Sequence, residues 1–284
     1  MLFKDIRDYQ ISFLSLFLVV GIGTRDWTLR PELIGVLIAT CLLTQWILSW
    51  LTGKQKIPSL RSALITSLGL SLLLRADRWT TMVIAAASAI ASKFIFKFGE
   101  KHFFNPANFG IICVLVVTSD AWVSPGQWGE EWWYALLFTG TGGMILQRIG
   151  RWDTTAAFLG AYSLLEAIRN LWLGWTWDVY WHRLMSGSLL LFALFMITDP
   201  RSIPNSRIGR VVWASCIAGL TFILRNYLFI PTAVFWALFI LAPLSIVLDV
   251  LWLAPQFSWQ RKDEGDGEDK KDRKAEGELL TQHS

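Results

Sequence analysis

The stretch RLMSGSLLLFALFMITDPR at residues 183–201 has a counterpart earlier in the chain, RSALITSLGLSLLLRADR at residues 61–78. Each begins with a basic residue followed by small or hydroxyl side chains, continues through a leucine-rich run, and ends at an aspartate close to an arginine. About thirty residues after each stretch, a proline (Pro106 and Pro231) opens another apolar run. Chance similarity between two leucine-rich segments is the alternative, but the matching aspartate and proline positions favour two copies of one unit.

The composition predicts an all-α, polytopic integral membrane protein. Hydrophobic residues make up 54% of the chain and charged residues only 17%, whereas soluble domains carry about 25% charged residues. Apolar runs recur at lengths that can cross about 30 Å of hydrocarbon as helices. A large soluble core is the alternative that this composition disfavours. The ten predicted spans are 9–23, 32–52, 60–75, 79–98, 106–121, 131–148, 154–173, 184–198, 209–225 and 231–254.

The ten spans divide into two inverted five-helix repeats. With five helices in each copy, the second copy must insert upside down, as in many transport proteins. We therefore expect a transmembrane domain over residues 1–258, with repeat one at about 9–121 and repeat two at about 131–254. Residues 259–284 form the remaining segment, and from Gln260 onward it mixes charges with glycines and contains no aromatic residue. Such a composition predicts a disordered tail.

Basic residues in the short loops predict the orientation. If the N-terminus is cytoplasmic, thirteen Lys and Arg residues fall on the inside and six on the outside, before the six Lys and Arg residues of the tail are counted. We therefore expect both termini in the cytoplasm and a location in the inner membrane, or in an equivalent energy-conserving membrane. The six outside residues are Arg25, Arg30, Arg75, Arg78, Arg183 and Arg225.

The first candidate binding segment is the start of the fifth span. Asn105 suits the N-cap and Pro106 the first helical position, and they are followed by Asn108 and Gly110. A helix N-terminus at membrane depth can receive an anionic or carbonyl group. A plain capped helix start is the alternative.

The second candidate segment is the eighth span with the residues that follow it. Ser186 and Gly187 are small enough for close helix contact, and Asp199 near Arg201 could pair where the helix ends. A purely structural ion pair is the alternative. We expect the two segments to meet near the middle of the bundle, so that Asn108 and Asp199 line a polar pocket.

Other polar positions give weaker signals. Glu166 and Arg169 are three residues apart in the seventh span, so we expect them to pair on one helix face. The sequence has no P-loop, dinucleotide fingerprint, HExxH or paired-cysteine motif. It therefore predicts no metal site, no self-contained catalytic site and no nucleic-acid binding.

At FNPANFG (104–110) and LMSGSLLLFALFMITDPRSIPNSRIGR (184–210), the sequence resembles the RnfD membrane protein of Rnf-type electron-transport complexes and its relative NqrB from the Na⁺-pumping NADH:quinone oxidoreductase. The likeness runs from about Ser62 to Leu253. It implies ten helices in two inverted repeats and electron relay coupled to Na⁺ or H⁺ movement. It also implies a flavin mononucleotide joined through its phosphate to a threonine after the fifth helix.

The loop after the fifth span departs from that family pattern. Residues 119–131 read SDAWVSPGQWGEE, with no threonine and with Ser124 as the only hydroxyl in the middle. We therefore expect no covalent flavin, and the cofactors left open are a non-covalent flavin (FMN or riboflavin) or a quinone. The expected partners are the lipid bilayer, other Rnf- or Nqr-type subunits and a second copy of the chain. The alternative function is a stand-alone channel or carrier for a small solute or flavin-like molecule on the same scaffold.

Overall fold

The computed structural model describes residues 5–24, 30–53, 60–124 and 132–257. The chain divides into two compact units, 1–254 and 255–284, and the helices and strands described below all belong to the first. The charged tail expected from residue 259 onward lies outside the described residues. So do most of the loop residues that follow Ser124.

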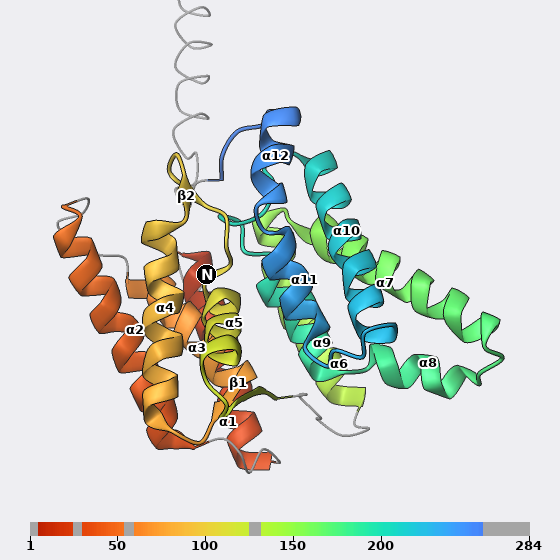
Figure 1. The fold of residues 1–284 in the computed structure, drawn as a ribbon, viewed down its shortest axis with the longest axis horizontal. Coiled ribbons are helices and arrows are strands. Elements are labelled where there is room, and N and C mark those ends of the chain that lie inside the picture. The colour runs from red at the N-terminus through yellow and green to blue at the C-terminus, as the bar shows by residue number, and fades with distance from the viewer. Residues whose placement is uncertain (1–4, 25–29, 54–59, 125–131, 258–284) are drawn as a thin grey trace, which may run out of the picture. The chain divides into compact units, whose positions relative to one another are not determined.

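Helices form most of the first half of this unit (Figure 1). Proline opens two of them, α2 and α5, because the first helical position needs no backbone N–H donor. Helix α3 packs against both α1 and α2, and α4 packs against α2 and α5. The helices are α1 (Ile6–Thr24), α2 (Pro31–Leu51), α3 (Leu60–Leu73), α4 (Trp79–Ile95) and α5 (Pro106–Val117).

The second half is also helical, but its helices are interrupted. Gly174 ends α7 with φ of 65°, a left-handed conformation that glycine adopts without strain. After Pro243, which cannot continue the hydrogen-bond ladder, the chain bends by 47°. The helices are α6 (Trp132–Ile149), α7 (Trp152–Trp172), α8 (Trp177–Leu184), α9 (Gly187–Leu191), the π-helix η1 (Phe192–Met196), α10 (Arg207–Asn226), α11 (Ala233–Leu241) and α12 (Leu244–Leu251).

Two small antiparallel ladders close loops of the first half. β1 (Leu74–Ala76) pairs with β4 (Ala121–Val123), with Leu74 opposite Val123. β2 (Lys97–Phe98) pairs with β3 (Lys101–His102) in a tight hairpin between α4 and α5. Neither ladder was predicted, and neither was the short helix α8.

The predominantly helical, apolar fold is confirmed, and each of the ten predicted ranges falls on a helix or on a bent pair of helices. Fewer of them are both long and apolar enough to cross a membrane by themselves. Among the described residues, three helices meet that test (α1, α2 and α10), or up to five if each bent pair counts as one span. The bent pairs are α8 with α9–η1, at 49°, and α11 with α12.

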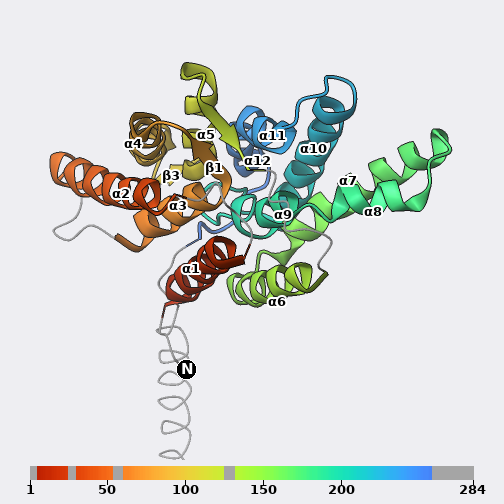
Figure 2. The same cartoon turned by 90° about the horizontal axis from the view of Figure 1, so that it is seen from below.

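The helices of each half pack in the same order. In the first half α4 packs between α2 and α5, and α3 packs on α1. In the second half α10 packs between α7 and α11, and the broken helix α9–η1 packs on α6. The halves meet where α5 contacts α11 and where α1 contacts α6 (Figure 2). Ring contacts at these junctions include Phe104 with Phe239, stacked with centroids 5.0 Å apart, and Phe17 with Phe138.

Candidate functional site

Asn105 caps α5 and joins the two halves of the bundle. Its Oδ1 accepts a hydrogen bond from the backbone N–H of Asn108 at 3.0 Å, as an N-cap residue does. Its Nδ2 donates to the backbone oxygen of Met196, at the end of η1, also at 3.0 Å. Pro106 follows at the first helical position. The start of α5 and the end of the broken helix therefore meet, and we call this junction the polar seam (Asn105, Asn108, Met196 and Phe235).

Asn108 lies deepest in the polar seam, with 1% of its surface exposed. Its Nδ2 donates to the backbone oxygen of Phe235 in α11 at 3.1 Å. Its Oδ1 is buried and accepts no hydrogen bond from the described residues. A buried acceptor without a partner costs about 1–3 kcal/mol, so this oxygen is available to a donor or a cation that reaches it.

Gly110 serves the packing of α5 against α4. A Cβ atom at this position would lie 2.5 Å from the backbone oxygen of Ala85 and 2.9 Å from Cβ of Ala89. The space beside Gly110 is therefore filled by α4, and the residue lets the two helices approach closely.

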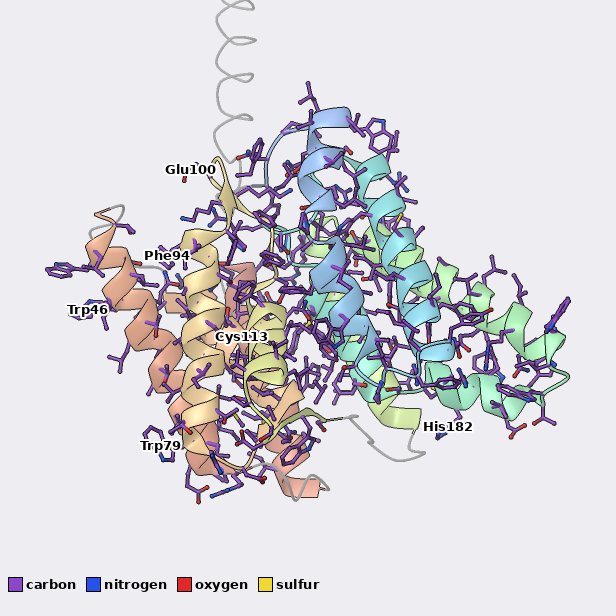
Figure 3. All side chains as sticks on the ribbon, viewed as in Figure 1. Trp46, Trp79, Phe94, Glu100, Cys113 and His182 are labelled. Atoms are coloured by element: carbon purple, nitrogen blue, oxygen red, sulfur yellow. The ribbon has the colours of Figure 1, made fainter. Side chains whose placement is uncertain are left out.

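Asp199 contacts the β2–β3 hairpin. Its Oδ2 lies 3.6 Å from Nε2 of His102 in β3, and its Oδ1 accepts from the backbone N–H of Arg201 at 3.2 Å. Burial disfavours the carboxylate, but the contact with His102 and the backbone hydrogen bond hold the pKa of Asp199 below its usual value. The Arg201 guanidinium donates to the backbone oxygen of Glu100 at the hairpin turn (Figure 3). The ion pair considered for Asp199 and Arg201 is thus a backbone contact.

Ser186 and Gly187 lie at the other end of the broken helix. Ser186 precedes the first turn of α9, where its Oγ lies 2.9 Å from Oγ of Ser188. From Gly187 to Met196 the chain is helical, so about 15 Å of helix rise separates these residues from the polar seam. They are brought together with α8 rather than with Asn105.

A buried ion pair that the sequence did not reveal links the hairpin to α12. Lys101 Nζ lies 2.5 Å from Oδ2 of Asp249 and donates to the backbone oxygen of Ile203. The other oxygen of Asp249 accepts from the backbone N–H of Asn205 at 2.6 Å. Burial lowers the pKa of Lys101, and the hydrogen bond to Asp249 opposes that fall. A lone carboxylate in an apolar run was the available signal, because such a group must find a cation.

A second buried pair stands next to this one. The Arg210 guanidinium makes a bidentate contact with Asp153 in the first turn of α7 and donates to the backbone oxygen of Asn205 at 2.6 Å. Arg151 donates to the same backbone oxygen at 3.1 Å. The loop between η1 and α10 is therefore held by charged side chains of β3, α10 and α12 and by Arg151, which precedes α7.

Glu166 takes a partner that the sequence prediction did not name. Its carboxylate, 2% exposed, accepts from Arg183 at 3.1 Å and from Nδ2 of Asn226 at 2.8 Å. Arg169, the expected partner, instead lies over the ring of Trp175 at 4.5 Å. The Glu166–Arg169 prediction is wrong, because Arg183 and Asn226 occupy the Glu166 carboxylate.

Comparison with known proteins finds one family. Residues 117–256 match the model of the NQR2, RnfD, RnfE family. The relatives include the D subunit of the ion-translocating oxidoreductase complex of Vibrio vulnificus (strain YJ016), 32% identical over 45% of this chain and 36% of the relative. The corresponding protein of Actinobacillus pleuropneumoniae serotype 5b (strain L20) is 31% identical over 38% of this chain and 32% of the relative.

A third relative of the same name, from Halorhodospira halophila (strain DSM 244 / SL1), is 26% identical over 47% of this chain and 37% of its own length. The matched part of the chain thus spans about a third of the length of these relatives. The resemblance read from residues 184–210 is confirmed. The FNPANFG segment lies before the matched region, and so do most of the residues of the predicted first repeat.

Proposed function

We propose, from the relationship of residues 117–256 to the NQR2, RnfD, RnfE family, that this chain is a membrane subunit of an ion-translocating oxidoreductase complex. The relatives carry that complex in their names. The matched region contains the broken helix, the loop after it and α10, which hold most of the buried charged contacts. On this proposal the chain resides in the inner, energy-conserving membrane.

The observation that carries the proposal is the family match over residues 117–256, and the polar seam supplies a candidate site for it. Asn105, which precedes the matched region, bonds to Met196 inside it. Asn108 bonds to Phe235 and keeps its Oδ1 free of protein partners. Irregular backbone at membrane depth is tolerated where it faces protein or a polar cavity. A seam built from both halves, with one open acceptor, suits a site that responds to an ion or a proton donor.

The proposed architecture is a pair of inverted five-helix repeats. The shared packing order supports it, because α2, α4 and α5 pack as α7, α10 and α11 do. The contact of α5 with α11 supports it as well, since both helices follow the prolines that the repeat aligns. We further propose cytoplasmic termini, which put the β2–β3 hairpin inside and α8 outside.

The polar seam does not fit a flavin or a quinone ring. The rings of Phe104 and Phe239 already stack across it, and the Asn105 and Asn108 amides bond directly to backbone oxygens. A planar ring system would have to displace these contacts. We therefore propose that any flavin of the complex lies outside the seam and is not linked covalently to this chain. The loop that would decide the linkage falls largely at residues 125–131, outside the described part.

A stand-alone carrier for a small solute is the second candidate. The open Oδ1 of Asn108 favours it, because a transported donor could bond there. The two candidates differ in what they need, since a redox subunit requires partner proteins and a carrier does not.

The deciding experiment is purification of the tagged chain from its native membrane in a mild detergent. Mass spectrometry would identify the proteins that copurify, and absorbance before and after denaturation would detect flavin. Copurification of flavin- or iron–sulfur-containing subunits supports the complex. Recovery of the chain alone, with solute uptake after reconstitution, would overturn that proposal in favour of the carrier.

A further inference from the structure

Helix α8 packs on α7 and leaves most of its surface exposed. None of its eight residues is buried. Trp177 and Trp181, one turn apart, have exposed fractions of 50% and 55%. Asp178 and His182 form a second pair one turn apart, and His182 projects from α8 on the side away from α7 (Figure 3). The helix therefore presents an aromatic edge and a polar edge at once.

Specific contacts fix α8 against α7. Oγ of Ser163 and the hydroxyl of Tyr180 lie 2.5 Å apart, and Arg183 at the end of α8 pairs with the buried Glu166. The turn between the helices is held by Asn170, whose Nδ2 donates to two backbone oxygens of the turn. The orientation of the two exposed tryptophans is therefore set by the fold.

The surroundings of α8 are those of a bilayer surface. The guanidinium of Arg169 lies over the Trp175 ring, which is its contact among the described residues. Arginine beside an indole ring suits the headgroup level, where aromatic rings gather and phosphates accept from guanidinium groups. The preceding helix α7 exposes Leu164 and Ile168, which continue the apolar surface. Further exposed rings at this end belong to Trp172, Tyr227 and Phe229.

We propose that α8 lies in the plane of the membrane surface, with Trp177 and Trp181 at the boundary of headgroups and acyl chains and Asp178 and His182 in water. The occupant of its aromatic edge is phospholipid. A helix with separate aromatic and charged edges that continues an apolar transmembrane face is suited to that boundary.

Spin labels placed along α8 test this proposal. Single cysteines at positions 177, 178, 181 and 182 would be introduced with Cys113 and Cys216 replaced by alanine and the fully buried Cys41 retained. The labelled protein would be reconstituted in vesicles of phosphatidylethanolamine and phosphatidylglycerol. Power saturation then compares collisions with oxygen, which partitions into lipid, and with a water-soluble nickel chelate.

The ratio of oxygen to nickel accessibility should be high on the aromatic edge and low on the polar edge. Labels at 177 and 181 should favour oxygen, and those at 178 and 182 the nickel chelate. A label at the exposed Trp46 in α2 is the lipid-facing control and should favour oxygen alone. Nickel accessibility at all four sites would place α8 in water, and shielding from both reagents would indicate a protein partner. Either result overturns the proposal, and neither bears on the redox function.

Discussion

Lys101 and Asp249 are 148 residues apart in the sequence, yet Nζ of the first lies 2.5 Å from Oδ2 of the second. Their side chains are 10% and 15% exposed, so the pair is almost dry. Lys101 belongs to the hairpin of the first half and Asp249 to the last helix of the second. The pair therefore ties the two halves together at the end of the bundle where the hairpin lies.

A double-mutant cycle tests this tie. Lys101→Met and Asp249→Leu each leave one buried charge unpaired, so each should lower the free energy of unfolding by about 3–5 kcal/mol. The double variant removes both charges and should recover most of that loss. Thermal unfolding of the four proteins in one detergent measures the coupling. Additive losses would contradict the pairing.

Gly110 provides a test of packing. Gly110→Ala forces a Cβ against the backbone of α4, which cannot move freely, and should cost about 1–3 kcal/mol. Gly160→Ala in the middle of α7 is the matched control, because no atom lies within 4 Å of its added Cβ. There alanine should raise stability by about 0.5–1 kcal/mol through its helix propensity. Equal behaviour of the two variants in thermal unfolding would rule out the close α4–α5 contact.

The helices could be predicted from the sequence because each apolar run has its own length and its own breaks. The cap at Asn105 could be predicted for the same local reason. The predictions that failed concerned contacts between residues that are far apart in the sequence. Lys101 and Asp249 have no common local signal, and α8, with eight residues, is too short to show a clear apolar period. Ser186 and Gly187 share a helix with Met196 but sit at its far end, so membership in one motif did not make one site.

The contact of Asp199 with His102 predicts a pH dependence. Because the folded-state pKa of Asp199 lies below the usual value, the carboxylate contributes stability above about pH 4 and loses it as the pH falls through the folded pKa. The difference in Tm between the natural protein and Asp199→Asn should therefore shrink as the pH falls below about pH 4. His102→Gln should reduce the same difference. A Tm difference that stays unchanged down to about pH 3 would show that the carboxylate is not stabilised in the fold.

Two arginine variants test whether Glu166 pairs with Arg183, as in the structure, or with Arg169, as helix spacing predicts. Arg183→Met leaves a buried carboxylate without its cation and should lower the free energy of unfolding by about 3–5 kcal/mol. Arg169→Met removes only a ring contact and should cost about 0.5–1 kcal/mol. Thermal unfolding ranks the two variants. A larger loss of stability in Arg169→Met than in Arg183→Met would indicate that Arg169 is the partner of Glu166.

Replacement of Asn108 should change function without lowering stability. Asn108→Leu gives up one hydrogen bond but also removes a buried oxygen without a partner, so the free energy of unfolding should stay the same or rise by about 1 kcal/mol. If the open oxygen serves ion coupling, ion uptake by vesicles that hold the whole complex should nevertheless fall. A residue that lowers stability and supports activity is typical of a functional site.

Asn170 is the matched control for this variant, because its Oδ1 is also buried without a partner and its Nδ2 also donates to backbone oxygens. It lies in the last turn of α7, away from the polar seam. Asn170→Leu should lose about 1 kcal/mol of stability with its two hydrogen bonds and leave ion uptake per folded complex unchanged. If Asn108→Leu also keeps full uptake, the oxygen in the seam has no part in coupling. If both variants lose uptake equally, the loss comes from a general disturbance of the bundle and not from the seam.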